Sequence, residues 1–267
     1  MQSGATPPDN VAHSWPISLA EVNLLSDEIG GGSIREDVQQ AIERELLYRL
    51  GDGPDPGPLP GTFRELLLLS IAAVRLNACL SEFHARRAVK LGASPDEVRD
   101  AALTVILVGM IRWKMAGMGA FVAACDQAGK PLSSVGKSEF AGLRSYVQTV
   151  LNRDFPDMWE TLAAAAPGVL EGYMKLREHI LRPNAAEGAL PKWMVEVIVV
   201  GCDVVQGNAW GAQMHVRQAV RDGASPGQVL QAIALVMVEA GVPTYKGGGL
   251  DVILAAEDEA KSGSARR

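Results

Sequence analysis

Residues 77–98 read NACLSEFHARRAVKLGASPDEV, and residues 208–229 read NAWGAQMHVRQAVRDGASPGQV. Eleven of these 22 positions are identical at one fixed offset, 208 − 77 = 131 residues. Unrelated segments of ordinary composition would share about one or two positions. Self-similarity of this kind indicates an internal repeat, so the 267-residue chain is predicted to hold two copies of one helical unit.

The same offset pairs two glutamates and two histidines. Glu65 and Glu196 stand nineteen residues before His84 and His215, respectively, on what we expect to be the preceding helix. An antiparallel helix pair would bring each carboxylate towards its imidazole, and a buried Glu–His pair can pass protons near neutral pH. A structural interpretation stands beside this one, because a histidine on an apolar helix face is more often a satisfied core residue.

Helical periodicity dominates the chain and strand-like alternation is almost absent, which predicts an all-α fold. In each copy the His-bearing helix is expected to end at a glycine, Gly92 or Gly223. The next helix begins with Ser-Pro-x-Glu or Ser-Pro-x-Gln, the signature of a capping box. The predicted organisation is a loose N-terminal segment, a first repeat, a linker, a second repeat and a disordered tail, at 1–33, 34–128, 129–138, 139–256 and 257–267, respectively.

Charge and cysteine usage bound the class of protein. The net charge of −6 argues against nucleic acid or an anionic membrane as the main partner. The apolar run at 66–74 is about half as long as a membrane span, and the first residues lack the apolar core of a signal peptide. The three cysteines have no CxxC spacing, which favours reduced thiols. We therefore expect a cytoplasmic protein.

The pattern Glu-x11-Asn-x6-His, followed by Ala-Val-x-x-Gly-Ala-Ser and a helix, resembles the carboxymuconolactone decarboxylase and alkylhydroperoxidase D superfamily. The resemblance covers about 62–120 and 191–255, with a similar lead-in at 166–173. It implies two tandem all-helical repeats of that type. Because members usually form trimers or hexamers, it also implies a homo-oligomer, a trimer of tandem subunits.

The redox branch of this superfamily carries a CxxC on the His helix, and this chain lacks it. The two cysteines would fall on Asn77 and Leu80, or on Asn208 and Gly211. Cys79 stands one position out and would point about 100° away from Leu80 on the helix surface. A second hypothesis is a divergent peroxidase-like protein that uses Cys79. The missing second cysteine argues against it, because thiol–disulfide chemistry needs two sulfurs in reach.

The decarboxylase branch lacks those cysteines and keeps the histidine. The resemblance then implies a cofactor-free lyase or isomerase acting on a small carboxylated lactone or enoic acid, of the kind formed in the catabolism of aromatic compounds. His215 or His84 would be the acid/base and Glu196 or Glu65 its partner. The expected substrate-binding residues are Asn208 or Asn77 as an oxyanion donor, Trp210 as a pocket wall, and Tyr245 and Lys246, a pair that recurs as Trp113-Lys114.

Two further expectations complete the prediction. The second repeat is the favoured site, because its segment Glu239-Ala240-Gly241-Val242-Pro243 resembles the decarboxylase branch. No metal site is expected, because neither His84 nor His215 has a second ligand at metal-binding spacing on its helix. A third hypothesis is non-catalytic: a helical oligomer that binds a small ligand or a partner and whose Glu–His pairs are structural.

Overall fold

The structure is a computed structural model that describes residues 34–50, 57–111, 122, 145, 157–181 and 188–264. The described residues are mostly helical, and no strand occurs among them. The predicted all-α fold is confirmed. Within the same ranges, no helix combines the length and the apolar character needed to cross a membrane.

Two sets of three helices carry the repeated sequence. In the first half these are α3 (Gly61–Val74), α4 (Ala78–Lys90) and α5 (Pro95–Val108). In the second half they are α10 (Lys192–Val205), α11 (Ala209–Arg221) and α12 (Pro226–Ala240). Each helix of the second set begins 131 residues after its counterpart in the first.

The helix ends follow the sequence signals. Ser94 and Ser225 each accept a hydrogen bond from the third residue of the following helix, whose side chain bonds back to the serine N–H, so both capping boxes form. Gly92 and Gly223 have φ values of 106° and 113°, a backbone region in which a side chain would be strained. The two glycines therefore let the chain turn sharply out of α4 and α11.

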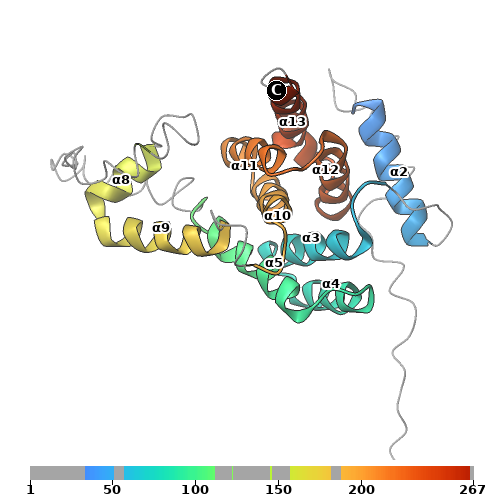
Figure 1. Ribbon diagram of the computed structural model, residues 1–267, viewed down its shortest axis with the longest axis horizontal. Coiled ribbons are helices and arrows are strands. Elements are labelled where there is room, and N and C mark those ends of the chain that lie inside the picture. The colour runs from blue at the N-terminus through green and yellow to red at the C-terminus, as the bar shows by residue number, and fades with distance from the viewer. Residues whose placement is uncertain are drawn as a thin grey trace, which may run out of the picture.

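The offset extends to one more helix pair, α2 (Glu36–Leu50) and α9 (Pro167–Leu181). Each packs against the third helix of the other half: α2 against α12, and α9 against α5. Figure 1 shows α2 and α9 at opposite ends of the molecule, with the repeated helices between them. The two halves are thus joined by exchanged lead-in helices.

Buried hydrogen bonds hold these crossings at equivalent positions. On α5, Asp100 accepts from the N–H groups of Ala189 and Leu190, at 2.8 and 3.2 Å. On α12, its counterpart Gln231 accepts from the N–H of Leu59 at 2.7 Å. Leu59 and Leu190 lie just before α3 and α10, so the third helix of each half fixes the entrance to the first helix of the other.

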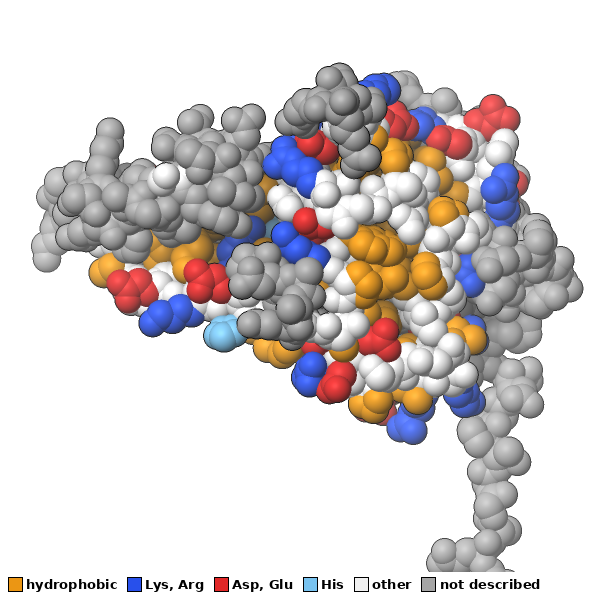
Figure 2. Space-filling view, in the orientation of Figure 1, with side chains coloured by type: hydrophobic (Ala, Val, Ile, Leu, Met, Phe, Trp, Pro, Cys, Tyr) orange, Lys and Arg blue, Asp and Glu red, His pale blue; other side chains and the backbone are white. Residues whose placement is uncertain are grey.

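The core forms where α3, α10 and α12 meet. Gly201 of α10 allows close packing, because a Cβ there would lie 2.8 Å from Leu67 Cδ1 of α3. Fully buried leucine, isoleucine and valine side chains fill this junction, among them Leu67, Ile71, Ile198, Val200 and Ile233. On the outer surface, Figure 2 shows hydrophobic side chains gathered near the middle of one face.

The predicted disordered tail at 257–267 is wrong over its first eight residues, since α13 runs from Leu250 to Ser264. Glu259, only 6% exposed, receives both Nε and an Nη of Arg221, and Glu257 pairs with Arg35. These ion pairs, together with the buried residues earlier in α13, stabilise the helix where its sequence becomes polar. The predicted N-terminal segment at 1–33 and the predicted linker at 129–138 lie outside the described residues.

Candidate functional site

The first Glu–His pair is buried and closed. Glu65 on α3 and His84 on α4 meet through Oε2 and Nδ1 at 2.6 Å, and His84 is only 1% exposed. The other carboxylate oxygen of Glu65 accepts from Nε of Arg87 at 3.0 Å, one helical turn beyond the histidine. Glu65 is therefore neutralised by a guanidinium in addition to its imidazole partner, as in a structural ion pair.

The second pair has the same geometry in a different setting. His215 Nδ1 lies 2.6 Å from Glu196 Oε2, and both side chains are almost fully buried. The position of Arg87 is taken by Gln218, which donates to Asp222 instead of to the glutamate. With Nδ1 bonded to the carboxylate, the imidazole presents Nε2 for chemistry on its other side.

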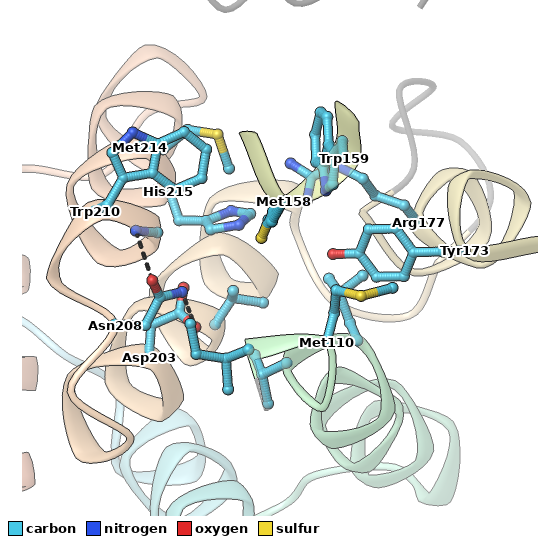
Figure 3. A pocket seen from close by; sticks show the side chains of 15 residues that line it. Met110, Met158, Trp159, Tyr173, Arg177, Asp203, Asn208, Trp210, Met214 and His215 are labelled. Atoms are coloured by element: carbon cyan, nitrogen blue, oxygen red, sulfur yellow. Dashed lines mark hydrogen bonds between the residues drawn. The ribbon is translucent and has the colours of Figure 1, made fainter. Parts of the chain in front are cut away.

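That other side is a pocket between the two halves of the chain. Its walls come from α5, α8 (Asp157–Ala165), α9, α10 and α11, and its volume is about 30 Å³. In Figure 3 the His215 ring projects into this space towards Met158. The apolar and aromatic lining consists of Leu107, Val108, Met110, Ile111, Met158, Trp159, Val199, Trp210 and Met214.

Four further lining residues are charged or polar: Tyr173, Arg177, Asp203 and Asn208. Arg177 of α9 lies with Cζ 5.8 Å from the ring centre of the buried Trp159, a cation–π distance. Tyr173 stands one turn earlier, and burial raises the pKa of its phenol; the positive charge of Arg177 opposes that rise and Asp203 adds to it. Figure 3 shows Arg177 and Tyr173 on one wall, with Asp203 on the wall facing them. The pocket therefore has a basic side chain on one wall and an acidic side chain on the facing wall.

Asp203 belongs to a small polar cluster with Asn208 and Gly211. The Asn208 side chain donates through Nδ2 to Asp203 Oδ1 at 3.0 Å and accepts from the Gly211 N–H at 3.2 Å. A Cβ on Gly211 would lie 2.1 Å from Asn208 Nδ2 and 2.6 Å from Asp203 Oδ2. The glycine is thus required by the side chains that fill the space beside it.

The first half has apolar residues at four of these positions and keeps only the asparagine, as Asn77. The 131-residue offset relates Tyr173, Arg177, Asp203 and Gly211 to Ile42, Leu46, Ala72 and Leu80. Ile42 and Leu46 belong to the buried core. The Glu–His pair is common to both halves, whereas the polar pocket beside it is a property of the second.

The remaining residues predicted for the site have varied positions. Trp210 lines the pocket. Asn77 and Asn208 are the N-caps of α4 and α11, each accepting a backbone N–H through its side-chain oxygen. Tyr245 and Lys246 do not line the pocket: the buried Tyr245 accepts from the Arg35 N–H at 3.3 Å, and Lys246 is exposed.

Sequence analysis missed Arg87, Tyr173, Arg177 and Asp203. An alignment of the two halves would have singled out Asp203 and Arg177, because these charged residues align with the apolar Ala72 and Leu46, respectively. No spacing rule would have placed Arg177 in the pocket, since that depends on how α9 crosses α5. For metals, the described residues contain no group of three or more His, Cys, Asp or Glu side chains that could hold an ion.

Comparison with known proteins relates the second half of the chain to one protein family. The model of the carboxymuconolactone decarboxylase family matches residues 167–249, which include α9, Glu196 and His215. A Burkholderia xenovorans LB400 structure, provisionally named a gamma-carboxymuconolactone decarboxylase subunit, is 18% identical with a TM-score of 0.59, over 90% of this chain and 98% of its own. A second structure from that organism, provisionally named a carboxymuconolactone decarboxylase, is 21% identical over 49% of this chain and 98% of its own, with a TM-score of 0.44. Among curated protein sequences, none matches.

The predicted resemblance to this superfamily is therefore confirmed. Residues 167–249, in the second half, match the model of the carboxymuconolactone decarboxylase family, and the chain as a whole shares the fold of the first Burkholderia structure. The match covers the lead-in helix as well as the Glu–His pair, so the helix that supplies Tyr173 and Arg177 lies within the matched region.

Proposed function

We propose that the second half carries the active site of a cofactor-independent lyase or isomerase, at which His215 transfers a proton to or from carbon of a small carboxylated lactone or enoic acid. The observation that carries the proposal is the pocket itself: a carboxylate-backed imidazole on one side and a guanidinium on the facing wall. Arg177 would hold the substrate carboxylate that is retained, since guanidinium groups match carboxylate geometry.

Glu196 would orient the imidazole and stabilise its protonated form, as a buried carboxylate does for a catalytic histidine. In a decarboxylation, the electron pair of the breaking C–C bond would move into the substrate's unsaturated system as CO2 leaves. The protonated Nε2 of His215 would then deliver a proton to carbon, and solvent would restore that proton. An isomerisation would use the same nitrogen first as base and then as acid.

The pocket would have to widen to admit such a substrate, because a cavity of about 30 Å³ has room for only a few water molecules, at about 10–15 Å³ each. Met110, Met158 and Met214 make this possible, since methionine side chains have three rotatable bonds and repack at low cost. Trp159 and Trp210 would then flank the body of the substrate. A planar, unsaturated acid suits this lining better than a sugar or a polyol.

The proposal is tested with a panel of γ-lactone carboxylates and β,γ-unsaturated acids, assayed for released CO2 and for deuterium gained from D2O. His215→Ala should lower turnover by roughly 10²–10⁴-fold, the usual contribution of a positioned acid/base. The matched control is His84→Ala, which removes the equivalent imidazole and should leave the turnover of the folded protein unchanged. Equal activity of wild type and His215→Ala would contradict the proposal.

A homo-oligomer, a trimer of such chains, completes the proposed assembly. The large side chains that the described residues leave exposed include Leu76, Ile106 and Val169, at 81%, 57% and 55%. Burial of these side chains in a subunit interface would remove their apolar surface from water. Light scattering on the purified protein should give three times the mass of the 28.3 kDa chain, and the mass of one chain would contradict the assembly.

A further inference from the structure

A tyrosine hydroxyl lies in the pocket with no role in the proton transfer described above. Tyr173 of α9 lines the pocket one helical turn before Arg177, and in Figure 3 its hydroxyl end points into the space towards the wall that carries His215. It is the one hydroxyl among the described lining residues. Its ring packs against the buried Trp159, with 6.4 Å between the ring centres, which restricts the direction of the hydroxyl.

This hydroxyl is available as a hydrogen-bond donor to a ligand. No described residue accepts a hydrogen bond from Tyr173, and the neighbouring guanidinium of Arg177 can only donate. Burial raises the pKa of the phenol; Arg177 opposes that rise and Asp203 adds to it. The phenol therefore keeps its proton at neutral pH and can offer it to an acceptor in the pocket.

The oxyanion donor expected from the sequence is already engaged within the protein. The side-chain oxygen of Asn208 accepts from the Gly211 N–H at 3.2 Å, and its Nδ2 donates to Asp203 Oδ1 at 3.0 Å. An oxyanion bound to that nitrogen would share it with a carboxylate. The Tyr173 hydroxyl has no such acceptor to share among the described residues.

The first half provides a comparison without the hydroxyl. The 131-residue offset relates Tyr173 to Ile42 and Arg177 to Leu46, and both of these apolar residues belong to the buried core. The first half nevertheless keeps its Glu–His pair, closed at the same 2.6 Å. The hydroxyl and the guanidinium thus accompany the pocket, which the second half alone builds beside its imidazole among the described residues.

A substrate anchored at Arg177 would lie between the phenol and the imidazole. In the decarboxylation considered above, the electron pair of the breaking C–C bond moves onto a carbonyl oxygen of the unsaturated lactone as CO2 leaves. A hydrogen-bond donor that is already in place stabilises the negative charge on that oxygen. The electron pair then returns from oxygen to form a C–H bond with the proton from His215 Nε2, and the carbonyl is restored.

We propose that Tyr173 is a further catalytic residue of this site, whose hydroxyl donates a hydrogen bond to the oxygen that becomes negative during the reaction. The phenol keeps its own proton throughout. His215 supplies the proton to carbon, and Arg177 holds the carboxylate that is retained. The inference rests on the proposed function, because that reaction is what generates the oxyanion.

The first experiment measures the kinetics of Tyr173→Phe, which removes the hydroxyl and keeps the ring. The substrate is the γ-lactone carboxylate of the panel that the wild type turns over fastest. We expect kcat to fall by roughly 10²–10³-fold, as when one oxyanion donor is removed. KM should change by less than about threefold, because the carbonyl gains its charge only during the reaction. The matched control is Tyr245→Phe, which removes a hydroxyl outside the pocket and should leave kcat unchanged.

The second experiment needs no turnover. Tetronic acid is a five-membered lactone whose enol is ionised at neutral pH, so it mimics the negative oxygen, and the unsubstituted α,β-butenolide is its neutral counterpart. Binding of each to the full-length protein is followed by tryptophan fluorescence, since Trp159 and Trp210 line the pocket. Tyr173→Phe should weaken the binding of tetronate by about tenfold or more and that of the butenolide by less than about threefold.

The outcomes separate this inference from the function on which it rests. A wild-type kcat in Tyr173→Phe, or equal losses of affinity for tetronate and the butenolide, would overturn the role of Tyr173 and leave that of His215. Failure of tetronate to bind the wild type would overturn it as well. Undiminished turnover in His215→Ala would overturn the proposed function, and the tetronate measurement would then still decide whether the hydroxyl binds an oxyanion.

Discussion

Replacing Gly211 by alanine tests the polar cluster of the pocket directly. The added Cβ would lie 2.6 Å from Asp203 Oδ2 and 2.1 Å from Asn208 Nδ2, so both side chains must move and their 3.0 Å hydrogen bond is lost. Loss of a hydrogen bond to a buried charge costs about 1.5–3 kcal/mol. Alanine regains up to about 1 kcal/mol of helix propensity. We therefore expect a net loss of about 1–2 kcal/mol in the free energy of unfolding.

The same substitution should behave differently once the acid is removed. In an Asp203→Ala background there is no Asn208–Asp203 bond to lose, and Asn208 can turn as Asn77 does. Asn77 caps α4 beside Leu80, accepting from the Leu80 N–H at 3.1 Å. The helix-propensity gain then acts alone, so Gly211→Ala should be neutral or stabilising by up to about 1 kcal/mol.

The assay is urea unfolding followed by circular dichroism, on the four proteins of this double-mutant cycle. Gly172→Ala on α9 is the matched control, because a Cβ there meets nothing within 4 Å and should stabilise by up to about 1 kcal/mol. A cost of Gly211→Ala that is equal with and without Asp203 would refute the reasoning. Stabilisation by Gly211→Ala in the wild-type background would refute it as well.

The hydrogen bonds of Gln231 and Asp100, which join the two halves, should each contribute to the free energy of unfolding. Gln231→Ala leaves the Leu59 N–H without its acceptor and should cost roughly 1–3 kcal/mol in urea unfolding, and Asp100→Ala should cost at least as much because two N–H groups lose theirs. Alkylation by iodoacetamide at pH 8, mapped by mass spectrometry, should label the exposed Cys79 and spare Cys202. Burial raises the pKa of the Cys202 thiol, so its reactive thiolate would form only at higher pH. Labelling of Cys202 at the rate of Cys79 in the native protein would contradict the packing of α10.

Local features of the sequence were enough to predict the helices and the Glu–His pairs. The capping boxes at Ser94 and Ser225 are local signals, and the structure forms both. A separation of nineteen positions from each glutamate to its histidine fits one helical hairpin, which explains why both contacts close at 2.6 Å. Such features depend on neighbours along the chain.

What the sequence could not show depends on contacts between distant segments. The tail after residue 256 is polar, and its helix is supported by the pairing of Glu259 with Arg221, 38 residues away. Arg177 and Tyr173 reach the pocket because α9 packs on α5 of the other half. Asp203 lies within an apolar run of the sequence, and its place in the pocket lining follows from the tertiary packing. Periodicity and spacing describe none of these relations.

The central claim is that His215 faces a ligand pocket and that His84 is enclosed. The most direct measurement is a ¹H–¹³C NMR spectrum of the imidazole Cε1–H groups, titrated with benzoate and assigned through His215→Ala and His84→Ala. The account predicts that the His215 signal moves on titration, that the His84 signal stays in place, and that Arg177→Gln abolishes the His215 shift. A His84 signal that moves while His215 remains unchanged would contradict the account.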